Sequence, residues 1–578
     1  MHSVMLSCNR WHLFCHLAVL FVLALPATIY RHSFIRNGQR SWWYYSQSDS
    51  CQACAAQSVS QRLGSSIETA VWPGATKSTP YLYYHLLSGK PSSHNVSDVE
   101  ALLSESVYFH WRMSHIYTLA FIWIFYLFLA RVTKSQIIAF AAAIPIAINR
   151  SYAFQDSQIR PEILSLVWLF AAGLIAVTQF QSRYRSYDSL ILGVCFGFAV
   201  LSKIQVIPAM PFILLLFFLH RFNLWRVPNY YGNNSAPSIY LCVVLSLCAS
   251  IGFLKTTLIA GATYGLPGYA NTAAKASFIV TIILIITGGL LAHWGNPLIG
   301  NIGRNAVYFT GGSAISLFIT TLPHLLYGGI RIFLSAVNTT LFGMASFGYY
   351  GLGLPNSSGW GFSKSLYDKL EAFDSFQKTS FIVGIGTHSL ALVSLVTISL
   401  LILFLILISL INSRENLGGC TRESGGKQTF QPHSWEWLAG GSVLCLLTAL
   451  IFDFSMTNRT VNGSIYYFYH IYTIPFYMLA FALGLSAVIK KTCGSFLTTL
   501  NSPLCLIVFM LPVSYTALRI AGGSDMVKGW ETPENPVAEY MRNLEIIEGV
   551  SPNFFTLTHS TFNDLKSDLL RKHGSGAR

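Results

Sequence analysis

Four stretches of this chain are almost entirely apolar and are close to the length that a lipid bilayer requires. They lie at residues 163–180, 277–294, 388–411 and 466–489. A helix of about 20 consecutive apolar residues spans the hydrocarbon core of a membrane. Only 10% of the residues are charged, whereas soluble domains carry about 25%, and the mean hydropathy is +0.49. The chain is therefore expected to be an all-α polytopic membrane protein.

A span placed over every apolar run predicts about 13 transmembrane helices, within a range of about 11 to 14, because some of the runs are short. The loops that this order places in the cytoplasm all carry lysine or arginine, as the positive-inside rule predicts. The N-terminus is accordingly expected inside. The spans are predicted near residues 11–30, 112–130, 137–148, 163–180, 189–201, 204–220, 237–254, 277–294, 309–327, 388–411, 436–454, 466–489 and 501–520.

The net charge of +14 is spread along these loops and forms no basic block, so we expect a membrane and no nucleic acid as a partner. The first span, in which the small residues of "ALPAT" follow an apolar core, is either retained or cleaved as a signal peptide. Its apolar run is long for a signal sequence, which favours retention. The expected location is the plasma or inner membrane, or the endoplasmic reticulum in a eukaryote.

Hydrophilic segments divide the chain into three predicted modules. They are 1–220 with an external loop at 31–111, then 221–520 with an external loop at 328–387 and a cytoplasmic loop at 412–434, and a small external tail at 521–578. Aromatic and amphipathic patterns in the first loop predict helices that lie on the membrane surface. In the same loop, Cys51 and Cys54 either form a local disulfide or remain two free thiols.

The stretch "QDSQIRPEIL" interrupts the apolar pattern with Asp156, Arg160 and Glu162 at the mouth of a span. Charged residues in a membrane are costly and usually face a cavity or a partner. A structural explanation is an ion pair between Arg160 and Glu162 that closes a turn, with Pro161 at the first helical position. That explanation does not account for Asp156. Nor does it account for Asp49, an isolated acid after the first span on the same predicted side.

Several further motifs accompany these acids. They are the Pro-Gly element in "WPGATKSTPYLYYHLL", the acidic turn "QDSQIRPE", the lysine followed by proline in "GVCFGFAVLSKIQVIPAMPFILLL" and the late span "YYFYHIYTIPFYMLAFALGL". Together they resemble the GT-C superfamily of polyprenyl-phosphate-sugar-dependent glycosyltransferases, of the protein mannosyltransferase or aminoarabinose transferase type. The likeness is best over residues 1–220. Members often carry Arg-Tyr ahead of the late-span proline, where this chain has His470 and Tyr472 before Pro475.

The resemblance implies an enzyme that moves a hexose or pentose, with inversion, from a polyprenyl-phosphate donor to a hydroxyl of a lipid, glycan or protein acceptor at the outer or lumenal face. The reaction needs a general base for the hydroxyl and positive charge for the departing phosphate. Asp49 is the expected base, and Asp156 orients the acceptor or shares that role. Glu162 is expected to hold Arg160. The donor phosphate is expected to contact Lys203, Arg160, Arg459 and His470.

Each candidate also has an ordinary structural explanation. Asp49 suits the N-cap of a surface helix, and Lys203 suits a helix end from which a long cationic chain reaches water. His470 resembles a hydrogen-bonded core histidine, and Arg459 a solvated loop charge. No acidic motif calls for a metal, so no cofactor is expected, with a divalent cation left open.

Two other function classes compete with the transferase. One is a multi-pass transporter or lipid flippase, which would predict inverted repeats with broken helices in matching halves; the sequence shows no such symmetry. The other is a non-catalytic membrane assembly subunit, which would not need acids beneath external loops.

Overall fold

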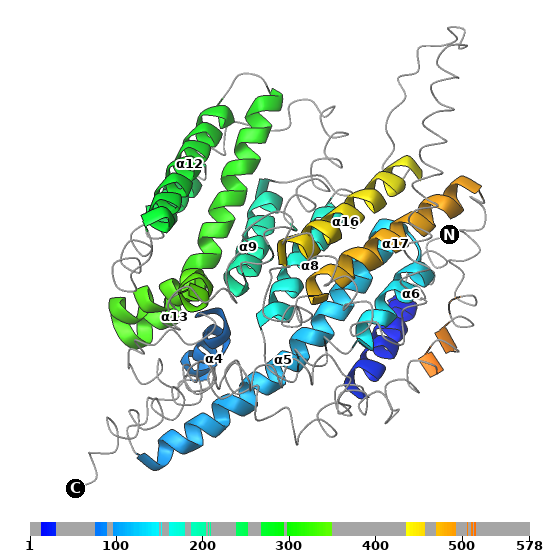
Figure 1. Ribbon diagram of the computed structural model, residues 1–578, viewed down its shortest axis with the longest axis horizontal. Coiled ribbons are helices and arrows are strands. Elements are labelled where there is room, and N and C mark those ends of the chain that lie inside the picture. Colours follow the sequence, from blue (N-terminus) through cyan, green and yellow to red (C-terminus); the bar gives the residue numbers. More distant parts are fainter. Residues whose placement is uncertain are drawn as a thin grey trace, which may run out of the picture.

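The computed structural model describes residues 13–29, 75–88, 96–149, 152, 156, 161–179, 186–203, 206, 209, 239–251, 268–293, 297–349, 435–456, 470–492, 506, 510–511 and 514–515. Every regular element within these residues is a helix, so the all-α prediction is confirmed for this part of the chain (Figure 1). In chain order they are the helix Leu13–Ile29, α4 (Ala75–Ser88), α5 (Val96–Thr133), α6 (Gln136–Ala147), α8 (Pro161–Gln179), α9 (Ser186–Ser202), the helix Ile239–Ile251, α12 (Gly268–Ala292), α13 (Pro297–Tyr349), α16 (Trp435–Met456) and α17 (His470–Thr492).

Three of the described helices contain segments long and apolar enough to cross a membrane: Arg112–Thr133 in α5, Ile302–Tyr327 in α13 and Ile471–Lys491 in α17. Further predicted spans coincide with shorter apolar helices, which are Leu13–Ile29, Gln136–Ala147, Glu162–Val177, Asp188–Ser202, Ile239–Ile251, Phe278–Ala292 and Trp437–Phe452. The predicted span at 388–411 lies outside the described residues, and those at 204–220 and 501–520 lie mostly outside them. The number of spans therefore stays a prediction.

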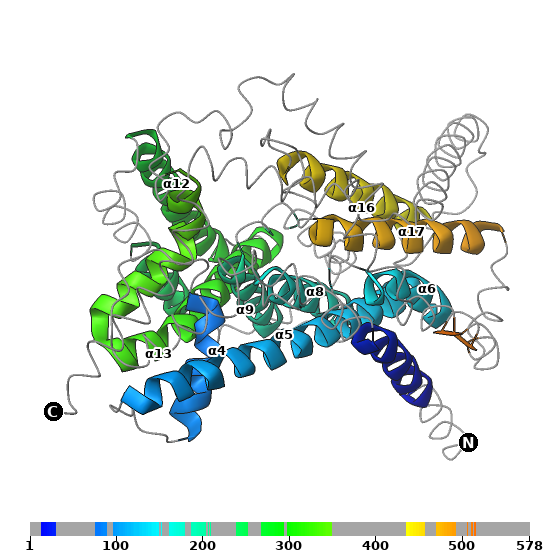
Figure 2. The ribbon, with the colours of Figure 1, turned by 60° about the horizontal axis from the view of Figure 1, so that its bottom comes forward.

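Two helices are at least twice as long as the spans predicted within them. α5 has 38 residues and α13 has 53, which at 1.5 Å per residue gives lengths of about 57 Å and about 80 Å. Because the hydrocarbon core of a bilayer is about 30 Å thick, both helices are too long for a single straight crossing. The turns of α5 before residue 112 and those of α13 after residue 327 fall in segments predicted as external loops, whereas the first turns of α13, at 297–308, fall in a predicted cytoplasmic loop. α4 forms in the first external loop, where the aromatic pattern after the Pro-Gly element predicts a helix, and it lies beside α5 in Figure 2.

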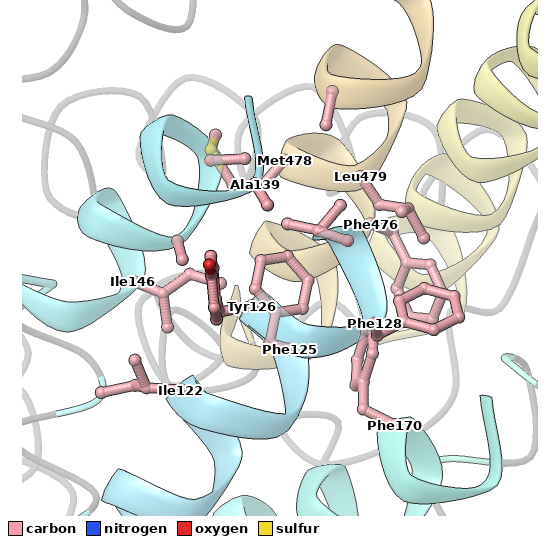
Figure 3. Packing of buried hydrophobic residues seen from close by; sticks show 14 of the residues in the cluster. Ile122, Phe125, Tyr126, Phe128, Ala139, Ile146, Phe170, Phe476, Met478 and Leu479 are labelled. Atoms are coloured by element: carbon pink, nitrogen blue, oxygen red, sulfur yellow. The ribbon is translucent and has the colours of Figure 1, made fainter. Parts of the chain in front are cut away.

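One hydrophobic cluster joins helices from both predicted transmembrane modules, including α5, α8 and α17. At its centre Phe125, Phe170 and Phe476 are almost completely buried (Figure 3). The ring of Phe170 lies 5.1 Å from that of Phe125 and 5.7 Å from that of Phe476, centroid to centroid. Such aromatic pairs contribute about 0.5–1.5 kcal/mol each beyond their burial. The late helix α17 is thus fastened to the N-terminal helices.

Helices α9 and α13 approach each other so closely that glycine is required at the contact. A Cβ atom on Gly193 would overlap the backbone carbonyl oxygen of Phe309, and one on Gly312 would overlap that of Leu190. Ser313 adds a hydrogen bond of 3.1 Å from its hydroxyl to the Gly193 carbonyl. Small residues at helix contacts allow this close packing in membranes. The contact fixes the position of α9 and of the residue that follows it.

Helix α4 is held against α13 at the proline inside that long helix. Pro323 has no N–H to donate to the carbonyl of Ile319, four residues earlier, and Tyr83 of α4 supplies a hydroxyl donor at 2.6 Å. Thr79 donates in the same way to the carbonyl of Thr320 at 2.9 Å. The hydroxyl of Tyr83 thus replaces the missing backbone donor, which is one way in which membrane helices tolerate proline.

Candidate functional site

The site is built where α8 begins and α9 ends. These two helices follow each other in the chain with only residues 180–185 between them and pack together. A short connection makes neighbouring helices antiparallel. The first turn of α8 and the last turn of α9 consequently lie at the same end of the helix pair. We call this end of the molecule the Glu162 end.

A buried ion pair joins the two helices at the Glu162 end. The ammonium nitrogen of Lys203 lies 2.9 Å from a carboxylate oxygen of Glu162, and their side chains are 3% and 1% exposed. Glu162 stands in the first turn of α8, where the partial positive charge of the helix terminus favours a carboxylate. Removing two charges from water costs several kcal/mol per ion. A site that holds both charges in this way is a candidate for function.

Helix α17 is anchored to the same turn of α8. The hydroxyl of Ser165 donates to the backbone carbonyl of Glu162 at 2.6 Å and lies 3.1 Å from the hydroxyl of Tyr472. Tyr472 stacks against Phe452 of α16 with a centroid separation of 5.8 Å. His470, the first residue of α17, is two residues before Tyr472. The start of α17 therefore belongs to the Glu162 end.

A second polar group at this end centres on Asp156, which is completely buried. One carboxylate oxygen of Asp156 lies 3.0 Å from Nδ1 of His115, and Nε2 of His115 lies 3.2 Å from the hydroxyl of Thr28. The hydroxyl of Ser114 holds the backbone carbonyl of Asp156 at 2.9 Å. The three side chains form a continuous chain of hydrogen bonds from a buried carboxylate to an exposed hydroxyl.

The chain limits how far apart the two polar groups are. Asp156 and Glu162 are six positions apart, so their Cα atoms are separated by at most about 20 Å. Thr28 lies in the last turn of the helix Leu13–Ile29, and His115 lies near the start of the apolar part of α5. Carboxylate, imidazole and ammonium groups thus gather at one end of the helices.

Of the residues predicted for the site, Asp156, Glu162 and Lys203 fall in the described part of the chain and lie at the Glu162 end, and His470 begins the helix anchored there. Asp49, Arg160 and Arg459 lie outside the described residues, so their roles stay predictions. The partner predicted for Glu162 was Arg160; the described partner is Lys203.

Sequence reasoning missed His115 and Thr28. They are separated from their partners by 41 and 87 positions, and no spacing rule connects residues at such distances. The available signal was the polar group "WRMSH", which places hydrogen-bonding side chains in the first turn of a predicted span. Polar residues inside membrane helices usually have a partner or a function.

The arrangement supplies two kinds of chemistry. Lys203 offers an ammonium group to an anion, and the Asp156–His115 pair can accept and hold a proton. Within the described residues, no group of three or more His, Cys, Asp or Glu side chains is placed to hold a metal ion. Comparison of the chain with protein-family models, with curated proteins and with solved structures finds no match.

Proposed function

We propose that this chain is a membrane glycosyltransferase that moves a sugar from a polyprenyl-phosphate donor to the hydroxyl group of an acceptor, at the outer or lumenal side of the membrane. The observation that carries the proposal is the buried ion pair between Lys203 and Glu162. The pair lies among apolar helices, which suit the polyprenyl chain of the donor. It also lies at the end of a helix, which suits the phosphate of that lipid.

The ion pair suits the binding of an anion for an electrostatic reason. The ammonium group of Lys203 has three donors, and Glu162 occupies part of that donor capacity. An incoming phosphate supplies negative oxygens at the same cation, and charge-assisted hydrogen bonds of this kind are about twice as strong as neutral ones. As the sugar leaves, charge builds on the phosphate, and a fixed cation then stabilises the transition state more than the ground state.

The test begins with a variant that keeps the helices together. Lys203→Ala alone would leave Glu162 buried without its cation, and breaking a buried pair typically costs about 3–5 kcal/mol. The double variant Lys203→Met with Glu162→Gln removes both charges and keeps the volumes similar. Lys491→Met is the matched control, because Lys491 is also a lysine at a helix end, where it lies 4.2 Å from the ring centre of Trp435.

Binding of undecaprenyl phosphate and dolichyl phosphate to the protein in nanodiscs is then measured by native mass spectrometry. We expect the double variant to bind at least about tenfold more weakly than wild type, which corresponds to the loss of about one charge-assisted contact. The Lys491→Met control should bind as wild type does. Equal binding by the double variant and wild type would remove the role of Lys203 in holding the donor.

Transfer is measured with undecaprenyl- and dolichyl-phosphate carriers of radiolabelled mannose, glucose, galactose and arabinose. Wild type should move label from the lipid to a hydroxyl acceptor, and the double variant should lower the rate by about 10²–10³, as the loss of a transition-state donor does. If the protein instead carries the lipid between leaflets without transfer of the sugar, the flippase class replaces the transferase.

A further inference from the structure

The hydrogen-bond chain of Thr28, His115 and Asp156 is the strongest polar feature outside the Lys203–Glu162 pair. Exposure rises along the chain: Asp156 is 1% exposed, His115 is 19% exposed and Thr28 is exposed. The carboxylate is thus sealed from solvent, while Thr28 at the other end of the chain is a surface residue. The imidazole connects the two and is the group that something arriving from outside the protein can reach.

The geometry assigns the proton on the imidazole. An ionised carboxylate only accepts hydrogen bonds, so Nδ1 of His115, at 3.0 Å from Asp156, is the nitrogen that carries hydrogen. In a neutral ring Nε2 is then the acceptor. At 3.2 Å from Nε2, the hydroxyl of Thr28 donates to it. This is the arrangement in which a histidine removes a proton from a hydroxyl group.

We propose that Nε2 of His115 is the base that takes the proton from the acceptor hydroxyl, and that Asp156 is the positioning residue that fixes the ring. The proposal rests on the proposed glycosyl transfer and names its proton acceptor. In it the Thr28 hydroxyl marks the place that the acceptor hydroxyl takes when Thr28 rotates away. It also differs from the expectation of a carboxylate base at Asp49.

The reaction balances with these groups alone. The O–H bond of the acceptor breaks, and its proton moves to Nε2 of His115 while the oxygen forms a bond to the anomeric carbon of the sugar. The bond between that carbon and the phosphate oxygen breaks, and its electron pair leaves with polyprenyl phosphate. Asp156 stabilises the imidazolium through Nδ1–H, and the proton passes to water after the product departs.

Other histidines whose side chains are described do not share these features. His85 is 1% exposed, is enclosed by the rings of Tyr81 and Tyr84, and lies 3.9 Å from a carboxylate oxygen of Glu105, a distance too long for a hydrogen bond. His16 lies 2.9 Å from the hydroxyl of Tyr126 and 3.1 Å from the amide nitrogen of Gln136. Gln136 begins α6, which runs toward the Glu162 end, so His16 lies at the opposite end of the helices. His115 alone among these three forms hydrogen bonds with both a buried carboxylate and the hydroxyl of an exposed residue.

The experiment measures single-turnover transfer with the same radiolabelled donors, beside binding of undecaprenyl phosphate by native mass spectrometry. His115→Ala should lower the transfer rate by about 10²–10⁴, the usual contribution of a general base, while lipid binding stays near that of wild type. Added imidazole should raise the transfer rate of the His115→Ala variant at least about tenfold, because it replaces the missing base. His293→Ala is the control, since His293 is an exposed residue that bonds to Gly289 of its own helix, stacks on the ring of Tyr240 and has no described ion pair with a carboxylate.

Asp156→Asn should lower the rate less than His115→Ala, and combining the two changes should add little, as expected for residues that act as a unit. Three outcomes overturn the inference. One is full transfer by His115→Ala. Another is a loss of rate that imidazole does not restore, which would indicate a structural role. The last is no transfer by wild type with any donor, which removes the proposed function and this inference with it.

Discussion

The phenolic hydroxyl of Tyr152 donates a hydrogen bond of 2.6 Å to the backbone carbonyl of Ile471. Four residues after Ile471 stands Pro475, which has no N–H to donate to that carbonyl. Burial raises the pKa of Tyr152 well above its usual range, so the hydroxyl keeps its proton and remains a donor. In the same way, the hydroxyl of Tyr83 donates to the carbonyl of Ile319, four residues before Pro323. Each of these two proline-containing helices therefore depends on a distant tyrosine.

Tyr152→Phe should destabilise the protein by about 1–3 kcal/mol, because it leaves a buried carbonyl without its donor. The loss should largely disappear in a Pro475→Ala background, where alanine restores the backbone N–H for Ile471. Thermal unfolding in detergent measures both. Tyr240→Phe is the control, as Tyr240 is 58% exposed. An equal loss in both backgrounds would show that Tyr152 stabilises by packing alone.

Gly193→Ala should separate α9 from α13, because the added Cβ meets the backbone of Phe309 and a backbone cannot move aside as a side chain does. Overpacking of this kind typically costs about 1–3 kcal/mol or more. Gly440→Ala is the matched control, since a Cβ there meets nothing within 4 Å. The midpoint of thermal unfolding should fall for the first variant and stay or rise for the second, because alanine favours helix. A similar midpoint in both would contradict the close contact.

Lys134 has a positive φ of 59°, in the left-handed region that side chains other than glycine disfavour. It stands between α5 and α6, just before the N-cap Ser135. Lys134→Gly should therefore be more stable than Lys134→Ala by about 1 kcal/mol; both variants remove the same charge. Chemical or thermal unfolding of the two in one detergent checks the difference. If the alanine variant is equally stable, the backbone strain at this turn is absent.

The predicted topology places the end of α4 and the end of α17 on opposite sides of the membrane. A single cysteine at Ser88, the last residue of α4, should react with an impermeant maleimide added to the outer or lumenal side of the membrane, and one at Thr492, the last residue of α17, should not. The motivation is the pair Lys490 and Lys491 in the last turn of α17, which the positive-inside rule places in the cytoplasm. Labelling in a cysteine-free background measures it. Reaction of both positions from outside would refute the topology.

The apolar runs were sufficient to predict helices, because the spacing and length of hydrophobic residues are local properties of the chain. The predicted ranges 137–148, 163–180 and 466–489 match α6, α8 and α17 closely. The ends of α5 and α13 were not predictable in this way. Their outer turns contain polar residues and lack the continuous apolar pattern by which a span is predicted.

Local pattern also selected Asp156, Glu162 and Lys203, since a charge in an apolar chain is conspicuous without any knowledge of its neighbours. Their partners depended on the tertiary structure. The antiparallel packing of α8 and α9 brings Lys203 to Glu162, and the arrangement of the first helix beside α5 brings Thr28 to His115. Such pairings join residues far apart in the sequence, and only the packing of the helices decides which of them meet.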